Sequence, residues 1–222
     1  MRDVEQASIK YRDEIIRKMI HLCSLSIPII AAQIPRQTSV MILAIVTTVA
    51  IVLDISRHFH PTTSKLFYTI FGFMLRDHER DQKKKNLNGA TYVLLSGLIC
   101  LIIFPQKIFT TAFTVLIISD TTAALVGRKF GTHKFLSKSL EGTLAFFISA
   151  VIVVFVTPKA DYLPIEYVFG IVTVAIGAIV ENVSYGWADD NFSIPISVGF
   201  ILWGLYEWLL PASVPHLSYL IK

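Results

Sequence analysis

Long apolar runs alternate with short polar stretches along most of this 222-residue chain. A helix needs about 20 predominantly apolar residues to cross a bilayer, and the runs with their flanks predict about seven such helices. They cover residues 15–34, 38–56, 90–105, 107–127, 142–157, 164–183 and 192–211. A shorter apolar run at 62–75 is not long enough to cross, and it predicts an interfacial or re-entrant segment.

The composition agrees with a membrane environment. Hydrophobic residues make up 54% of the chain and charged residues only 16%, whereas a soluble domain carries about 25% charged residues. We therefore expect an all-α integral membrane protein with a single polytopic domain over residues 1–222. The two cysteines, Cys23 and Cys100, both lie in apolar runs, and we expect them to be packing residues rather than a disulfide.

Basic residues are distributed unevenly between the two sides that this topology creates. The N-terminal segment and every second connection after it hold 16 of the 20 Lys and Arg residues, and the remaining segments hold four. Cytoplasmic segments of membrane proteins carry an excess of Lys and Arg. The distribution therefore predicts a cytoplasmic N-terminus and a C-terminus on the outside.

Polar motifs gather on the predicted cytoplasmic side, whereas the outer connections are plain. The inner motifs are RKMIH at 17–21, LRDHERDQKKKNLNGATY at 75–92, ISDTTAALVGRKFGTHKFLSKSLEGT at 118–143 and ENVSYGWADDN at 181–191. Chemistry that uses these groups is therefore predicted to take place at the cytoplasmic face, where nucleotides are found.

Asp120 is the most informative single residue, because it lies inside an apolar run. It comes about 12 residues after the outer start of its predicted helix, which places it roughly 18 Å deep. An ionisable group at such a depth is a functional candidate by default. Ala123, Ala124 and Gly127 share its helix face and would admit a neighbouring helix or a ligand. The alternative is an aspartate that pairs with a basic residue only to pack two helices.

Glycine and basic residues follow Asp120. Gly127 and Gly131 bracket Arg128 and Lys129. Glycine lets backbone approach a phosphate closely, and the basic side chains supply the counter-charge. An ordinary basic loop on the cytoplasmic side would have the same appearance, so this pattern is weak by itself.

Other polar residues on the same side also have two interpretations. Arg17 and His21 share a helix face, either as ligand-binding groups or as an interfacial anchor. Lys138 and Glu141 flank Ser139, a candidate helix cap. The loop before the third predicted span contributes Arg76, His78, Glu79, Asn88 and Gly89, and the loop before the last contributes Glu181, Asn182, Asp190 and Asn191.

Four of these motifs, in order, resemble one family. RKMIH, LRDHE followed by NGATY, DTTAALVGRKFG and KSLEG are similar to motifs of the dolichol kinase, phytol kinase and CTP-dependent diacylglycerol kinase family, which is related to the phosphatidate cytidylyltransferases. The resemblance runs from about Arg17 to Asn191. It implies an integral membrane enzyme that uses CTP to phosphorylate a lipid alcohol. The ending WADDNFSIPIS is closer to the kinases, because the long signature of the bacterial-type cytidylyltransferases is absent.

The resemblance implies a phosphoryl-transfer site, in which protein groups mainly hold the phosphates, neutralise their charge and align the acceptor hydroxyl. The hypothesis places Mg²⁺ on carboxylates and the triphosphate of CTP on basic side chains and glycine backbone. The expected metal ligands are Asp120, Glu79 and Glu141; the expected nucleotide-binding residues are Arg17, Lys18, Gly127, Arg128, Gly131, Lys138 and Asn88; and the expected catalytic residues are Asp120, His21 and Lys18. Asp120 and His21 are the two candidates for the group that accepts the hydroxyl proton.

Other functions remain open at this stage. A cytidylyltransferase would use the same site to attack the α-phosphate of CTP, a transporter would also place an aspartate in a membrane helix, and a membrane scaffold would need no chemistry. The expected partners are a lipid alcohol (a polyprenol, dolichol, phytol or diacylglycerol), a nucleotide and the bilayer, with no nucleic acid; a homodimer is left open. We expect a multi-pass protein of a bacterial or archaeal cytoplasmic membrane or of the endoplasmic reticulum.

Overall fold

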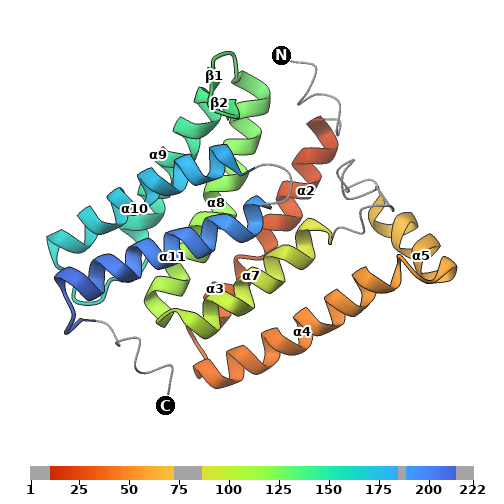
Figure 1. Cartoon of the computed structure of the whole chain (residues 1–222), viewed down its shortest axis with the longest axis horizontal. Helices are drawn as coiled ribbons and strands as arrows, with labels where there is room; N and C mark the ends of the chain where they lie inside the picture. The colour runs from red at the N-terminus through yellow and green to blue at the C-terminus, as the bar shows by residue number, and fades with distance from the viewer. Residues whose placement is uncertain (1–10, 73–86, 185–188, 214–222) are drawn as a thin grey trace.

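The structure is a computed structural model that describes residues 11–72, 87–184 and 189–213. These residues form a helical bundle with one two-stranded hairpin (Figure 1). The helices are α2 (Tyr11–Cys23), α3 (Ser26–Ala31), α4 (Arg36–Ser56), α5 (Pro61–Phe71), α7 (Gly89–Ile103), α8 (Gln106–Phe130), α9 (Leu140–Val156), α10 (Pro164–Val183) and α11 (Asp190–Leu209). The antiparallel strands β1 (Lys134–Phe135) and β2 (Lys138–Ser139) join α8 to α9.

Among the described residues, four helices are long and apolar enough to cross a membrane by themselves: α4, α8, α10 and α11. Two more, α7 and α9, are apolar but have only 15 and 17 residues. The described part of the chain is therefore that of a helical membrane protein, as the apolar runs predict. The short run at 62–75 is represented by α5, and the last residues of that range lie outside the described residues.

The segment expected to form the first span, 15–34, is two helices rather than one. The break lies at Ser24 and Leu25, between α2 and α3. Pro28 is the physical cause, because proline has no N–H to donate and its ring clashes with the carbonyl four residues earlier, here that of Ser24. The amide of Ser24 instead donates to the carbonyl of His21 at 2.9 Å, and that of Ile27 donates to Ser24 at 3.0 Å, both as tighter turns.

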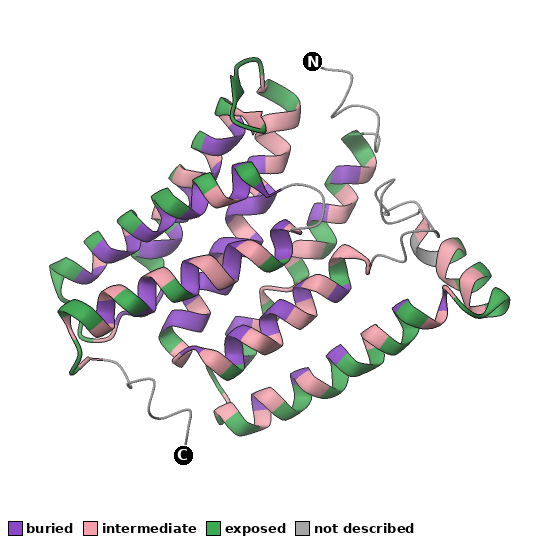
Figure 2. Ribbon diagram, viewed as in Figure 1, coloured by how far each residue is buried: buried purple, intermediate pink, exposed green. Residues whose placement is uncertain are grey.

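Helix α8 lies at the centre of the bundle and is the most buried of the four long helices. It packs against α2, α3, α7, α9 and α11. Its buried phenylalanines, Phe109 and Phe113, stack with their ring centroids 5.5 Å apart. By contrast, α4 lies at the edge and exposes a row of large apolar residues that includes Met41, Ile45 and Val49 (Figure 2). That row suits contact with lipid.

A buried ion pair holds the peripheral helices α4, α5 and α7 together. Arg57 Nε lies 2.7 Å from Asp54 Oδ1, and both side chains are fully buried. The second oxygen of Asp54 accepts the backbone N–H of Asn88, the residue that precedes α7, at 2.7 Å. The guanidinium of Arg57 also stacks 4.5 Å from the centre of the Phe67 ring in α5. The position of α5 therefore depends on a charge pair rather than on apolar packing alone.

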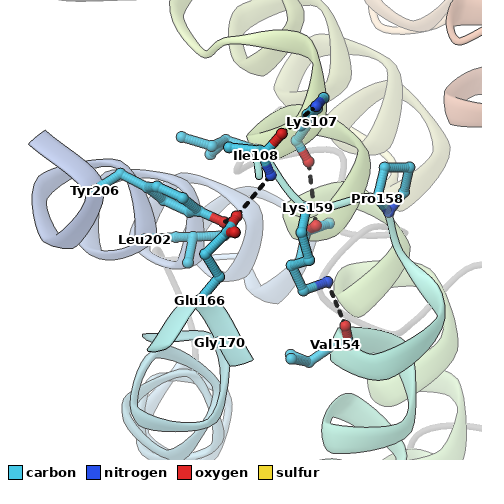
Figure 3. Close-up of a pocket in the computed structure, with 11 residues that line it drawn as sticks. Lys107, Ile108, Val154, Pro158, Lys159, Glu166, Gly170, Leu202 and Tyr206 are labelled. Atoms are coloured by element: carbon cyan, nitrogen blue, oxygen red, sulfur yellow. Dashed lines mark hydrogen bonds between the residues drawn. The ribbon is translucent and has the colours of Figure 1, made fainter. Parts of the chain in front are cut away.

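Charged residues close the helix ends at the opposite end of the bundle from Asp120. Figure 3 shows the small pocket there, where Lys159 points to the last carbonyls of α9 and Glu166 points to Tyr206. The ammonium of Lys159 donates to Val154 and, at 2.6 Å, to Thr157. Glu166 accepts the Tyr206 hydroxyl at 2.6 Å and the amide of Leu163 at 2.6 Å. Both groups thus satisfy backbone at helix ends, which is a structural role.

Close helix packing leads to a testable prediction at Gly199. A Cβ atom there would lie 2.2 Å from Phe104 Cε2, whereas a Cβ at Gly204 in the same helix would meet nothing within 4 Å. We expect Gly199→Ala to lower the free energy of unfolding by about 1–3 kcal/mol through overpacking. Gly204→Ala should be neutral or slightly stabilising, because alanine favours helix. Thermal unfolding of both variants in detergent micelles measures this; equal melting temperatures would contradict the packing at Phe104.

Candidate active site

The candidate site begins where α2 lies against α8 and brings two predicted residues to Asp120. The ammonium of Lys18 lies 2.5 Å from Asp120 Oδ2, and His21 Nε2 lies 3.8 Å from the same oxygen. Lys18 and Asp120 are both 3% exposed in their side chains. The RKMIH motif and the membrane aspartate therefore meet in the structure, although Lys18 and Asp120 are 102 residues apart in the chain.

The orientation of α2 explains how charged groups come to be buried here. Glu14 and Lys18, one turn apart, are the buried residues of this helix, whereas Ile15 and Met19 are exposed on another face. A helix in water would show the reverse arrangement. In a bilayer, ionisable residues face the interior of the bundle and apolar side chains face lipid.

A second charged cluster lies beside the first and includes a residue that the sequence did not single out. Glu14 Oε1 accepts Arg17 Nη2 at 2.6 Å, and Glu14 Oε2 accepts Arg17 Nε at 3.2 Å. Arg128 Nη2, from the inner end of α8, lies 3.6 Å from Glu14 Oε2. Glu14 could have been found from its spacing, because it lies three and four residues before Arg17 and Lys18 on the same helix.

A third cluster joins the hairpin to α10 and α11. Lys138 Nζ lies 2.5 Å from Glu181 Oε1 and 3.7 Å from Asp190 Oδ2. Burial acts to lower the pKa of Lys138, but the carboxylates of Asp190, Glu181 and Asp120 outweigh it, and the pKa lies above its usual value. The lysine therefore stays charged at neutral pH.

The three clusters form one charged region toward the C-terminal end of α8. Lys18 feels the charge of Asp190 as well as that of Asp120, and Lys138 feels the same two carboxylates in addition to Glu181. In Figure 1 the start of α2, the hairpin and the start of α11 lie at the same end of the bundle. This is the end that the charge distribution predicts to be cytoplasmic.

Asn182 fastens the hairpin to this region. Its side-chain oxygen accepts the backbone amides of Ser137 at 2.8 Å and Lys138 at 3.1 Å, and its side-chain nitrogen donates to Thr143 at 2.6 Å. Because Asn182 is fully buried, these bonds hold the backbone of Lys138 in a fixed position.

The predicted glycines have packing partners in the protein itself. A Cβ at Gly127 would lie 2.9 Å from Ser139 Oγ, and one at Gly131 would lie 2.8 Å from the same atom. Ser139 caps α9, as the sequence suggests, by accepting the amide of Gly142 at 3.2 Å. Both glycines are thus required for the turn between α8 and α9, whether or not a phosphate also lies against them.

Two other predicted site residues, Glu141 and Asn88, are engaged elsewhere in the described part of the chain. Glu141 accepts the Thr132 hydroxyl at 2.7 Å and bonds to His133 on the exposed hairpin, and these bonds hold its pKa well below the usual value. Asn88 caps α7 by accepting the amides of Ala90 and Thr91. Glu79 lies outside the described residues. Within the described residues, no group of three His, Cys, Asp or Glu side chains is arranged to hold a metal ion.

The fold and the site together define a class: a helical membrane protein with a buried cluster of acidic and basic residues at one end. The chain is 32% identical to an uncharacterised protein of Rickettsia prowazekii, over 82% of this chain and 89% of that protein. It is 29% identical to CTP-dependent diacylglycerol kinase 1 of Schizosaccharomyces pombe, over 68% of this chain and 73% of that protein. It is 31% identical to the phytol kinase of Synechocystis over 40% of this chain and 41% of that protein.

No family model matches the chain, and no solved structure matches it. The named relatives nevertheless belong to the family that the sequence motifs resemble. The chain belongs to the family of membrane lipid kinases that includes CTP-dependent diacylglycerol kinase and phytol kinase, and it is a phosphotransferase.

Proposed function

We propose that this protein transfers the γ-phosphate of CTP to the hydroxyl of a lipid alcohol at the cytoplasmic face of a membrane. The observation that carries the proposal is the buried contact between Lys18 and Asp120, which joins two motifs of the kinase family inside a bundle of apolar helices. CTP as the donor rests on the name of the fission yeast relative. Diacylglycerol and phytol, named in two relatives, are both apolar molecules with a hydroxyl group, and a polyprenol or dolichol has the same character.

Basic residues around Asp120 supply the groups that a triphosphate needs. Arg17, Lys18, Arg128 and Lys138 come from α2, α8 and the hairpin, and all four lie in the charged region at one end of the bundle. Each is paired with a carboxylate, so the region is charged but nearly balanced. We infer that nucleotide phosphates compete with these carboxylates for the basic side chains, which would make binding sensitive to salt.

A divalent cation would complete the charge balance when the nucleotide binds. Mg²⁺ is commonly held by one or two carboxylates together with phosphate oxygens and water, so a cluster of three protein ligands is not required. Asp120 is the carboxylate that fits this role, because it is buried next to Lys18 and lies within the family motif. Asp190, whose charge reaches both Lys18 and Lys138, is a better second ligand than Glu141. The ion, when bound, would neutralise charge on the transferring phosphate.

The reaction requires one proton acceptor. The lipid hydroxyl oxygen would attack the γ-phosphorus, the bond from that phosphorus to the β-phosphate oxygen would break, and CDP would leave. The hydroxyl proton would pass to a protein base. His21 Nε2 is buried and accepts no hydrogen bond from the described residues, whereas Asp120 is already engaged by Lys18. The geometry therefore favours His21 as the base, with the Asp120 carboxylate 3.8 Å from Nε2 stabilising the imidazolium that forms.

We also propose the full topology, with seven passes and the N-terminus in the cytoplasm. Counting α2 and α3 as one pass, the helices α4, α7, α8, α9, α10 and α11 complete the seven. In Figure 1 successive passes run in opposite directions, so the starts of α4, α8 and α10 lie at the end opposite the charged region. This alternation supports a C-terminus on the outside.

The topology predicts where two reporters will be found. A reporter fused after Lys222 should report the outside, and one inserted at residues 80–86 should report the cytoplasm, because the five passes α7 to α11 lie between the two sites and an odd number of passes changes the side. Accessibility of an engineered single cysteine at each site to an impermeant reagent gives an independent measurement. Both reporters on the same side would contradict seven passes.

Substitution of Asp120 tests the site. Asp120→Asn keeps the size of the side chain but removes its charge, so we expect lipid phosphorylation to fall by about two orders of magnitude or more, with the protein still inserted. Asp161→Asn makes the same change on an exposed residue at the other end of the bundle and should retain activity. Phosphorylation of a lipid alcohol in membranes, normalised to protein amount, is the measurement. Similar activities of the two variants would leave Asp120 with only a packing role.

Labelled CTP tests the reaction itself. Membranes that contain the protein are incubated with Mg²⁺, a lipid alcohol or a lipid phosphate, and CTP labelled at either the γ- or the α-phosphate. A kinase places γ-label in the lipid and releases CDP, so we expect γ-label, and we expect Asp120→Asn to abolish it. A cytidylyltransferase would instead place α-label in the lipid and release pyrophosphate. Transfer of α-label alone would replace the kinase proposal with that one.

A further inference from the structure

The second charged cluster contains a carboxylate with no direct part in the proposed reaction. Glu14 is 1% exposed in its side chain and lies at the inner end of α2. Its carboxylate lies 2.6 Å from the Arg17 guanidinium and 3.6 Å from that of Arg128, and nearby positive charge favours the ionised form. Glu14 is therefore ionised at neutral pH, and burying that charge must be offset by what it binds.

Its partners come from two helices and are both guanidinium groups. Arg17, one turn along α2, forms a forked pair with Glu14 through Nε and Nη2, at 3.2 and 2.6 Å. Arg128, from the inner end of α8, approaches the Oε2 atom at 3.6 Å. One carboxylate thus holds two arginines that would otherwise repel each other.

Glu14 contacts only part of the Arg17 guanidinium, and both arginine side chains remain partly exposed. Glu14 occupies two of the five N–H donors of Arg17, and the guanidinium keeps the others on its remaining edge. The side chains of Arg17 and Arg128 stay 13% and 17% exposed, in contrast to the 1% of Glu14. Planar guanidinium groups bind phosphate oxygens in pairs, and their affinity depends on how well their orientation is fixed.

We propose that Glu14 is a positioning residue, which holds Arg17 and Arg128 together as a two-arginine clamp for the phosphates of the nucleotide. This inference rests on the proposed function for the identity of the ligand, but the clamp can be tested by phosphate binding alone. The carboxylate itself contacts no phosphate; it acts only through the two guanidinium groups.

Nucleotide affinity in a Glu14→Gln variant distinguishes a positioning role from a purely electrostatic effect, because the two change the affinity in opposite directions. Glu14→Gln removes a negative charge from a phosphate site, and on electrostatic grounds alone the nucleotide should bind more tightly. If Glu14 holds the clamp, its loss removes a shared restraint on the orientation of the two arginines, and binding weakens. We therefore expect Glu14→Gln to raise the KM for CTP by about tenfold, with kcat changed much less, because the lost interaction is a charge-assisted one in the ground state.

Two further variants make the test specific. Asp13→Asn makes the same charge change one position earlier on α2, where the described residues show no ion pair to Asp13, and its KM should match that of the wild type. Arg128→Lys keeps the positive charge but removes the planar group, so it should raise the KM even if Glu14→Gln fails to fold. An unchanged or lowered KM in Glu14→Gln, or an unchanged KM in Arg128→Lys, would overturn the clamp.

Inorganic tripolyphosphate tests the clamp without any transfer to a lipid. Its binding to the purified protein is measured by calorimetry in detergent micelles. The wild type should bind it, Asp13→Asn should bind it equally, and Glu14→Gln should bind it about tenfold more weakly. This result would support the clamp even if no γ-phosphate reached a lipid. Failure of the wild type to bind tripolyphosphate, or equal binding by Glu14→Gln, would overturn the clamp while leaving lipid phosphorylation to be judged by its own assay.

Discussion

The charged region at one end of this protein is organised by the buried contact between Lys18 and Asp120. Either charge alone would be very costly to place among apolar helices, and the removal of one partner leaves the other uncompensated. The pair therefore fixes the rotation of α2 against α8, because only one face of α2 carries the lysine. Once that rotation is set, Glu14 faces Arg128 and His21 faces Asp120. One interaction thus determines which residues can act together.

Charged residues have different roles at the two ends of the bundle. At the end predicted to lie outside, Lys159 donates to a carbonyl at a helix end and Glu166 accepts an amide at a helix start, so both charged groups are hydrogen-bonded to nearby backbone. At the end predicted to be cytoplasmic, Lys18 and Lys138 instead form ion pairs with carboxylates from other helices. Only the second arrangement can be rearranged by a charged ligand, because phosphates can replace carboxylates as partners of the basic groups.

Much of the fold follows from the sequence, because its signals are local. Apolar runs of sufficient length predict the ends of six helices, α4, α7, α8, α9, α10 and α11, to within a few residues. The relatives confirm the family that the motifs suggest. The first run was wrongly expected to be one continuous element: α2 and α3 are separate, since Pro28 interrupts the backbone hydrogen bonds. Seven passes and their direction remain predictions, because four helices within the described residues are long enough by themselves to span a bilayer.

The sequence by itself determined that Asp120 and the RKMIH motif lie on the same side of a membrane bundle, since both follow from counting apolar runs and basic residues. Only the tertiary structure decided which residues meet. It brought Lys18 to Asp120 and Glu14 to Arg128, while Glu141 and Asn88 were assigned to local hydrogen bonds at the hairpin and at α7. The physical reason is that contact between distant helices depends on their relative rotation and depth, which the packing of the whole bundle sets and no local pattern records.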